Sequence, residues 1–253
     1  MKKITDKNGQ FNNAEFDAGS EFGEESKFGE ESKFGKESKF GEESKFGAES
    51  EFGHSSKFGE RSEFGHSSKF GERSEFGHSS KFGSGSKFGD SSKFGDSSKF
   101  GHSSKFGSGS KFGDNSKFGD NSKFGSGSKF GDNSKFGVYA KFGAYAKFGD
   151  NSKFGAYAKF GAESEFDAYS KFGSGCSYRG FAFKKFMSSA NIDGSGRQIK
   201  IFSAGKAVMV EAGCFWGTAE EFCNRAKKEG KNTYFNVVGA IAKAIMRGVA
   251  PGA

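Results

Sequence analysis

The sequence predicts a mainly β protein, a β-solenoid followed by a small α+β domain. The first observation is that Phe stands at every sixth residue from Phe16 to Phe172, which gives 27 positions. The second is that Ser or Ala precedes almost every one of these Phe residues by two positions, and Gly follows it directly. The third is that this register ends near residue 176. A period of six fits neither an α-helix nor a coiled-coil heptad, and short repeats of this kind are typical of β-solenoids.

Each hexad, read F-G-x-x-S-K from the Phe, is expected to supply one short strand and one corner. The alternation of a strand points Phe and the small residue inward, and it points the Lys or Glu between them outward. Gly is expected to turn the corner because it can adopt positive φ. Burial of each Phe contributes about 2–3 kcal/mol, so stacked Phe side chains are expected to form the core.

The charge pattern predicts three hexads per coil, and therefore nine coils. In EFGHSSKFGERSEFGHSSKFGERSEFG the residue before Phe alternates between Glu and Lys. Three hexads put residue i+18 on the next rung, so that Glu51 lies beside Lys69, whereas two or four hexads would align like charges. Asp also recurs every 18 residues from Asp96 to Asp150, although some tyrosines recur at 12.

The repeat resembles the hexapeptide repeat of left-handed β-helices, with Phe in place of the usual aliphatic residue. It is also similar to the right-handed pentapeptide-repeat solenoids, so the handedness stays open. The tract NIDGSGRQIKIF…AGCFWGTAEEF resembles a small C-terminal domain that follows hexapeptide solenoids in bacteriophage and prophage proteins. This resemblance implies a solenoid with a C-terminal α/β domain.

Three regions are predicted: an N-terminal cap (1–15), the solenoid (16–176) and a β-β-β-α-α domain (177–253). RQIKIF and AVMVEA read as strands, and NIDGSGR reads as an earlier hairpin turn. Thr218 and Glu221 form a capping-box pattern that opens a helix ending at Gly230. The final helix is expected to bury one face. That face consists of Phe235, Val238, Ile241, Ala242 and Ile245.

Aromatic residues near the end of the solenoid predict a contact surface. Tyr139, Tyr145, Tyr157 and Tyr169 occupy variable, outward positions on an otherwise polar repeat. The C-terminal domain of the same chain is the first occupant to expect there, and an external protein is the alternative. Trp216 is the candidate contact residue within the C-terminal domain.

The charge distribution suggests a second kind of surface. The net charge of +8 divides into −5 for residues 1–80, +6 for 81–176 and +7 for 177–253. Lys111, Lys129 and Lys147 are expected to form a ladder that could bind a polyanion such as nucleic acid. The alternative is that outward charges keep the solenoid soluble. The four His residues do not align at 18, so no metal site is expected.

A short motif, AGCFWGTAEEF, resembles the nucleophile motif of peptide methionine sulfoxide reductase A. That resemblance implies Cys214 as nucleophile, Phe215 and Trp216 as a cage for the substrate methyl group, and Glu220 or Glu221 as the acid. The alternative is that the cysteine and the aromatic pair belong to the core of the small domain. Three cysteines without metal spacing argue against a disulfide scaffold.

The expected function is that of a non-enzymatic structural or interaction protein that contacts a protein partner or self-associates. No cofactor and no small-molecule substrate are expected. No membrane span or signal peptide is expected either, so a cytoplasmic location is predicted, in the host cytoplasm or a virion if the chain is phage-encoded.

Overall fold

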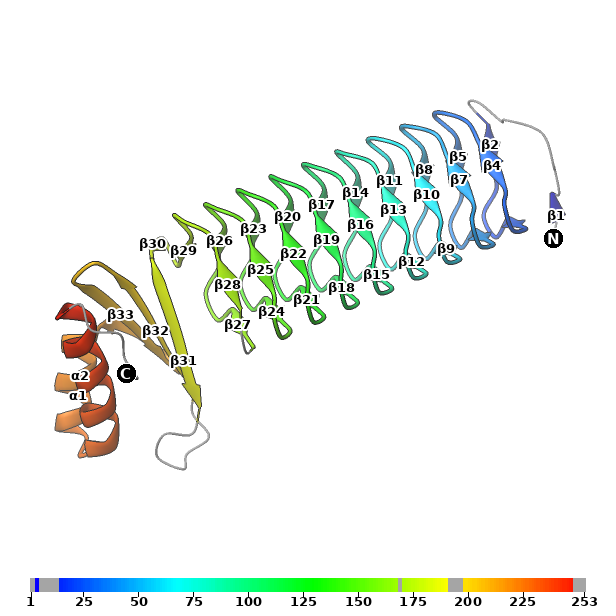
Figure 1. The fold of residues 1–253 in the computed structure, drawn as a ribbon. Coiled ribbons are helices and arrows are strands. Elements are labelled where there is room, and N and C mark those ends of the chain that lie inside the picture. The colour runs from blue at the N-terminus through cyan, green and yellow to red at the C-terminus, as the bar shows by residue number, and fades with distance from the viewer. Residues whose placement is uncertain (1–2, 5–13, 168–169, 191–197, 248–253) are drawn as a thin grey trace. The chain divides into compact units, whose positions relative to one another are not determined.

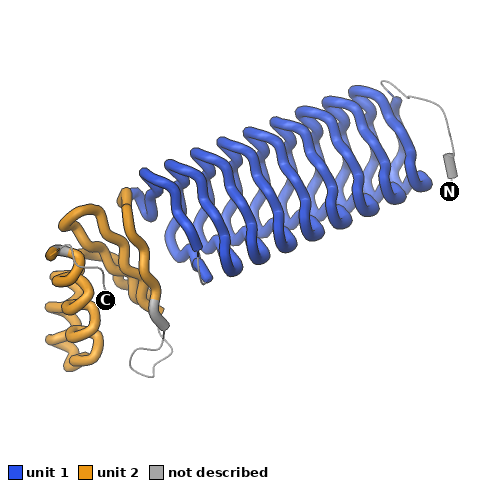
Figure 2. Tube along the Cα trace, in the orientation of Figure 1, with its two compact units in different colours: residues 1–180 blue, residues 181–253 orange. Residues whose placement is uncertain are grey.

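The computed structural model describes residues 3–4, 14–167, 170–190 and 198–247. The chain divides into two compact units, Met1–Gly180 and Phe181–Ala253 (Figure 2). This division falls four residues after the boundary expected at residue 176. No helix in the described ranges has the length and apolar character needed to cross a membrane.

The first unit is a β-solenoid in which successive coils are stacked along one axis (Figure 1). Each coil contributes one two-residue strand to each of three parallel sheets, here called A, B and C. Until the last rung is reached, each strand pairs with the strand 18 residues later, as in Glu51↔Lys69 and Phe52↔Phe70. Three hexads per coil and about nine coils are therefore confirmed.

The strands follow one another in the same cyclic order along the whole solenoid. Sheet A consists of β1 (Lys3–Ile4), β3 (Glu21–Phe22), β6 (Lys39–Phe40), β9 (Lys57–Phe58), β12 (Glu75–Phe76), β15 (Lys93–Phe94), β18 (Lys111–Phe112), β21 (Lys129–Phe130), β24 (Lys147–Phe148) and β27 (Glu165–Phe166). Sheet B consists of β4 (Lys27–Phe28), β7 (Lys45–Phe46), β10 (Glu63–Phe64), β13 (Lys81–Phe82), β16 (Lys99–Phe100), β19 (Lys117–Phe118), β22 (Lys135–Phe136), β25 (Lys153–Phe154) and β28 (Lys171–Phe172). Sheet C contains β2 (Glu15–Phe16), β5 (Lys33–Phe34), β8 (Glu51–Phe52), β11 (Lys69–Phe70), β14 (Lys87–Phe88), β17 (Lys105–Phe106), β20 (Lys123–Phe124), β23 (Lys141–Phe142), β26 (Lys159–Phe160) and β29 (Ser177–Tyr178).

Three columns of Phe rings fill the interior, one behind each sheet. Within a column the rings stack in parallel, as Phe76 and Phe94 do at 4.9 Å and 2°. Between columns they meet edge to face, as Phe94 and Phe100 do at 5.0 Å and 88°. Both arrangements suit the quadrupole of an aromatic ring, whose face is negative and whose edge is positive. Rings such as Phe94 are 5% exposed, so the predicted Phe core is confirmed.

The Gly after each Phe is required for a different reason from the one expected. Positive φ belongs to the residue two positions later, such as Ser55 at 59° or Tyr139 at 58°. A Cβ on Gly71 would instead lie 2.6 Å from the backbone nitrogen of His54 on the preceding rung. Gly is therefore needed because adjacent rungs approach too closely for a side chain at this position.

The small residue before each strand does more than fit a narrow space. The Ser98 hydroxyl, for example, is fully buried and donates to the Gly95 carbonyl at 2.8 Å. The same bond to the carbonyl three residues earlier recurs along the coil. No buried side-chain nitrogen or oxygen lacks a partner in the described parts of the chain. Each such Ser therefore forms a hydrogen bond within its own corner of the coil.

The two ends of the solenoid extend beyond the Phe repeat. At the N-terminal end, β1 adds a parallel strand beside β3, and the remainder of the predicted cap (1–2 and 5–13) lies outside the described residues. At the C-terminal end the hexad register continues one step past Phe172. Tyr178 is fully buried and pairs with Phe160, and Cys176 is buried at the small position. The chain then turns at Arg179 and Gly180, which both have positive φ.

The second unit is an antiparallel sheet with two helices on one face. After β30 (Phe181–Ala182) come β31 (Lys185–Ala190), β32 (Gln198–Ala204), β33 (Ala207–Ala212) and β34 (Phe215–Thr218), which pair in that order as a four-stranded sheet. Helix α1 (Ala219–Lys228) begins at the predicted capping box of Thr218 and Glu221, and α2 (Asn232–Met246) follows. The predicted turn NIDGSGR falls at 191–197, outside the described residues.

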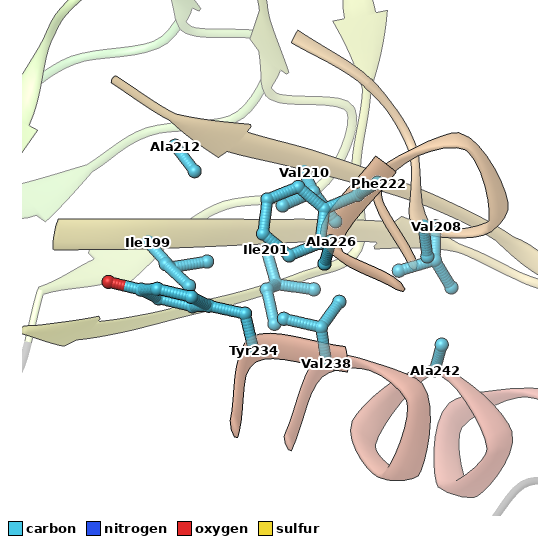
Figure 3. Packing of buried hydrophobic residues seen from close by; sticks show 11 residues of the cluster. Ile199, Ile201, Val208, Val210, Ala212, Phe222, Ala226, Tyr234, Val238 and Ala242 are labelled. Carbon is cyan, nitrogen blue, oxygen red and sulfur yellow. The ribbon is translucent and has the colours of Figure 1, made fainter. Parts of the chain in front are cut away.

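The core of this unit lies between the sheet and the helices (Figure 3). Ile199, Ile201 and Val210 from the sheet face Val238 and Tyr234 from α2. The face predicted for α2 is correct except at its start. Phe235 is exposed, and its neighbour Tyr234 is the buried aromatic residue. The strand β34, which contains FWG of the GCFWG motif, was not predicted.

Candidate interaction surfaces

Tyrosines lie on two different corners of the solenoid. The B–C corner is the segment between a sheet B strand and the next sheet C strand, and the C–A and A–B corners are defined in the same way. Tyr139 and Tyr157 lie one rung apart on the B–C corner, with rings stacked at 5.1 Å and 49% of each residue exposed. Tyr145 lies on the C–A corner and is 62% exposed. Tyr169 falls outside the described residues. The structure thus brings two of the four tyrosines together.

The predicted lysine ladder runs along sheet A. Lys111, Lys129 and Lys147 are direct neighbours on successive rungs, and all three are exposed. Lys147 pairs with Glu165 at 2.8 Å on the next rung. Sheets B and C carry parallel lysine ladders at the same level of the coil. The later coils are therefore basic on all three sides.

A groove runs along sheet B beside the A–B corner, with a volume of about 710 Å³. We call it the basic groove. It is lined by Lys99, Lys117, Lys135, Lys153, Lys171, Ser97, Asn115, Asn133 and Asn151. Among the described residues, no ion pair involves any of these five lysines. The groove therefore presents ammonium groups on consecutive rungs, and Asp96, Asp114, Asp132 and Asp150 lie on the adjoining A–B corner.

The A–B corner of the first coils is acidic, as it also is in the later coils, where Asp96, Asp114, Asp132 and Asp150 occupy it. We call the part in the first coils the acidic corner, and it consists of Glu24, Glu25, Glu42, Glu43, Glu60 and Arg61. Arg61 binds Glu43 at 2.8 Å and Glu42 at 3.0 Å, and it lies 3.6 Å from Glu60. One guanidinium against five carboxylates leaves a net charge of −4.

Ion pairs between rungs follow the predicted spacing of 18. Lys69 binds Glu51 at 2.6 Å, and Lys57 lies 3.5 Å from Glu75. The hydrogen bond from Lys69 lowers the pKa of Glu51. Because these side chains are largely exposed, each pair contributes little to stability.

The histidines have a structural role that the sequence analysis missed. The Nδ1 atom of His78 accepts the backbone N–H of Asp96 on the next rung at 2.9 Å. The carboxylate of Asp96 accepts the backbone N–H of Asp114 in the same way, also at 2.9 Å. No group of three potential metal ligands occurs within the described ranges. His and Asp at this position therefore bind the next rung.

The GCFWG motif forms a hairpin between β33 and β34. Cys214 is exposed in the turn, four residues before the N-cap of α1. Phe215 packs against Phe222 of α1, and Trp216 contacts Phe202, so the two aromatic residues lie on opposite faces of the sheet. They therefore do not form a common cage.

Hydrogen bonds favour the ionised form of Glu221 and Glu229, which does not suit a proton donor. Glu221 accepts the N–H and hydroxyl of Thr218 at 2.7 and 3.0 Å, and these hydrogen bonds lower its pKa. A pocket of about 220 Å³ beside Cys214 is lined in part by Glu229. Hydrogen bonds from Lys231 and Arg225 lower the pKa of Glu229 to about 2. A general acid would need a raised pKa.

The small domain contains a buried ion pair that the sequence analysis did not identify. Lys200 on β32 and Glu211 on β33 are direct cross-strand partners, 2.9 Å apart, with side chains 7% and 3% exposed. The alternation within RQIKIF and AVMVEA places these two residues on the face opposite the helices. That alternation was the signal that could have identified the pair.

Comparison of the chain with protein-family models, curated proteins and solved structures finds no match in any of the three.

Proposed function

We propose that the protein is a non-enzymatic interaction scaffold whose solenoid presents contact surfaces at fixed spacing. The observation that carries this proposal is the uninterrupted coil: the described hexads contain no inserted loop, and the interior is filled with Phe side chains. Because the interior holds no space for a small molecule, the variable residues can act only on the outside. A solenoid offers an extended surface of this kind.

The stacked pair Tyr139 and Tyr157 is the proposed contact for a protein partner. Aromatic side chains supply large contact areas at low conformational cost, and they are enriched where proteins bind each other. The neighbouring Val138 and Ala156 extend the apolar surface of the same corner. A partner with an exposed apolar segment would suit this surface.

The test is capture of partners from a lysate by the full chain, followed by mass spectrometry. A double variant, Tyr139→Ser and Tyr157→Ser, is expected to lose a partner that the unmodified chain retains. Tyr145→Ser on the C–A corner is the matched control and should retain it. Loss of the partner with the control alone, or no captured partner under any condition, would contradict the proposal.

The reductase remains the alternative activity of Cys214. Reduction of methionine sulfoxide by the full chain, abolished in a folded Cys214→Ser variant, would replace the scaffold proposal with an enzymatic one. The separated Phe215 and Trp216 and the ionised Glu221 support the non-enzymatic proposal. The resemblance to phage-type hexapeptide solenoids, with a role in a virion or the host cytoplasm, also remains a proposal.

A further inference from the structure

The backbone of the solenoid disfavours tyrosine at the positions of Tyr139 and Tyr157. Each is the second variable residue of its hexad, and each has a φ of 58°. A positive φ suits Gly and small polar residues better than a bulky aromatic one. From Ser79 to Asn133 the same position of every hexad holds Ser, Gly or Asn. The two tyrosines depart from this preference, which favours a role in a contact made outside the coil.

The stacked rings offer their edges and hydroxyls to a partner, and little of their faces. Tyr139 and Tyr157 stack on each other at 5.1 Å, with 10° between the ring planes. The other face of Tyr157 covers the next rung, because a Cβ on Gly175 would lie 2.6 Å from two of its ring carbons. Among the described residues, neither tyrosine hydroxyl has a hydrogen-bond partner.

This geometry favours a peptide over a single-stranded nucleic acid. A base stacks on an open aromatic face, and Tyr157 has both of its faces covered. Ring edges instead contact apolar side chains, and the phenol hydroxyls donate to carboxylate or carbonyl oxygens. Val138 and Ala156, which precede the tyrosines, add apolar surface to the same corner. A peptide supplies both the apolar side chains and the acceptor oxygens that this corner can bind.

The lysines on both sides of the tyrosine pair favour an acidic peptide. Lys141 and Lys159 follow the tyrosines by two residues, on sheet C. Lys135 and Lys153 precede them by four residues, on sheet B. All four side chains are exposed, and none forms an ion pair with a described residue.

The sheet C lysines are the more important of the two sets. Lys135 and Lys153 also adjoin the A–B corner, where Asp132 and Asp150 reduce the positive potential. On the coil of Lys141, by contrast, residues 138–146 contain no carboxylate. The approach from sheet C is therefore the more basic one.

Two carboxylates remain near the tyrosines on the sheet C side. Glu163 lies on the C–A corner, four residues after Lys159. Asp120 lies on the B–C corner, one rung before Tyr139. One Asp120 oxygen accepts the N–H of Val138 at 2.9 Å, and the other lies 3.6 Å from His102. The corner residues of the two tyrosine rungs are themselves uncharged, so the lysines determine the charge next to the rings.

We propose that the pair Tyr139 and Tyr157 binds an acidic segment of a partner protein, in which carboxylates flank an apolar side chain. The apolar side chain contacts the ring edges, and the carboxylates face Lys141 and Lys159. The proposal rests on the scaffold function, since it states the chemistry of the partner bound at this corner. Because the charges are exposed to solvent, binding weakens as the ionic strength rises.

The experiment measures the binding of three dye-labelled peptides to the full chain by fluorescence anisotropy. The acidic peptide contains Leu residues flanked by Glu, and the other two peptides carry Gln or Lys in place of Glu. The acidic peptide is expected to bind about tenfold more tightly than the neutral one at low salt, through contacts with two lysines. High salt should reduce this difference, and the basic peptide should bind least.

Two double variants separate the apolar contact from the charge. Tyr139→Ser with Tyr157→Ser should abolish binding of the acidic peptide. Lys141→Gln with Lys159→Gln should remove the preference for the acidic peptide while keeping the weaker binding of the neutral one. Circular dichroism should show that both variants are folded.

The matched control is Lys111→Gln with Lys129→Gln, which makes the same charge change on sheet A, the side of the coil opposite the B–C corner. This control should retain the preference for the acidic peptide. Equal affinities for the acidic and neutral peptides would overturn the proposal, as would the absence of binding by any peptide. An oligothymidine that binds more tightly than the acidic peptide and depends on the tyrosines would overturn it in favour of a nucleic-acid site.

Failure of this proposal can be distinguished from failure of the scaffold function. A partner that is captured from the lysate through Tyr139 and Tyr157, and is retained by the Lys141→Gln and Lys159→Gln variant, would overturn the acidic segment alone. The scaffold function would then stand with a partner bound by apolar contacts.

Discussion

Serine before each strand is restricted by a hydrogen bond as well as by space. The Ser98 hydroxyl donates to the Gly95 carbonyl at 2.8 Å, and Ser98 is fully buried. At Ala140, Ala146 and Ala158 the same buried position lacks a hydroxyl. Small size is therefore the strict requirement, and the hydrogen bond adds to it.

We expect Ser98→Ala to lower the free energy of unfolding by about 1 kcal/mol, through the lost hydrogen bond. Ser98→Val should lower it by about 1–3 kcal/mol more, because the added methyl groups overpack the corner. Ala140→Ser is the reverse control and should raise the free energy of unfolding. Urea unfolding measures all three, and equal stability of the Ala and Val variants would contradict the packing argument.

Asp167 gives the protein a pH-dependent site at the end of the repeat. It replaces the usual Gly, and burial together with Asp150 and Asp132 raises its pKa. A raised pKa means that ionisation disfavours the folded state, so this destabilisation is absent when the group is protonated and appears as pH rises through its pKa.

We expect Asp167→Asn to raise the unfolding temperature at neutral pH and to have little effect near about pH 3, where the carboxyl is protonated in both states. A shift that is the same at both pH values would show that charge is not the cause.

At the scale of the rung, backbone proximity sets the repeat. In the middle of the coil a Cβ on the Gly after Phe would meet the backbone of the preceding rung, whereas near the end of the repeat Asp167 carries a side chain at this position above a preceding rung. Gly23, in the first hexads, is different because a Cβ there would meet nothing within 4 Å. Adding a side chain at this Gly is therefore expected to destabilise the middle of the coil but not its first hexads.

We expect Gly71→Ala to destabilise the solenoid by about 1–3 kcal/mol or more, because the new methyl group meets the backbone of His54. Gly23→Ala should be neutral or stabilising by about 0.4–1 kcal/mol, since it restricts only the unfolded chain. Denaturant unfolding of the two variants measures the contrast, and similar losses in both would contradict the proximity argument.

Periodicity explains why the solenoid was predictable and the details were not. A strict repeat reveals the Phe core and, through the alternation of Glu51 and Lys69, the coil length. It does not reveal distances between rungs, so the role of Gly was assigned to positive φ instead. The last rung was missed because Tyr178 replaces Phe in the same register. In the small domain, a helical pattern alone could not decide between Tyr234 and Phe235.

The candidate sites were predictable to a smaller extent. Sequence spacing identified the lysine ladder and the exposed tyrosines. It did not show that Tyr145 lies on a different corner from Tyr139 and Tyr157. The groove beside Lys135 is lined by Asn side chains as well as lysines. The spacing of the lysines alone therefore could not predict it. The reductase role of Cys214 was suggested by the five residues GCFWG, whereas the positions of Phe215 and Trp216 on opposite faces depend on β34, a strand that the sequence did not predict.

At the scale of the whole molecule, the number of hexads determines which charges share an edge. Removing residues 94–111, one full coil, keeps the acidic corner and the basic groove on the A–B corner. Removing residues 94–105, two hexads, moves the groove to another corner while leaving every remaining hexad intact.

We expect both deletion variants to fold, because the strands that remain still pair with the strand 18 residues later. Circular dichroism measures the fold. Loss of the fold in the 12-residue deletion alone would show that stability depends on which corner each hexad occupies.

The positions of the aromatic residues also give the two units separate optical signals. The single Trp of the chain is Trp216, in β34 of the second unit, 5.9 Å from Phe202. The solenoid contains Phe and Tyr but no Trp. Selective excitation of tryptophan therefore reports on the small domain alone, while the near-ultraviolet circular dichroism of Phe comes mostly from the solenoid, where most Phe residues lie. Coincident transitions by the two probes would mean that the units unfold together, and separate transitions would give the stability of each unit without any label.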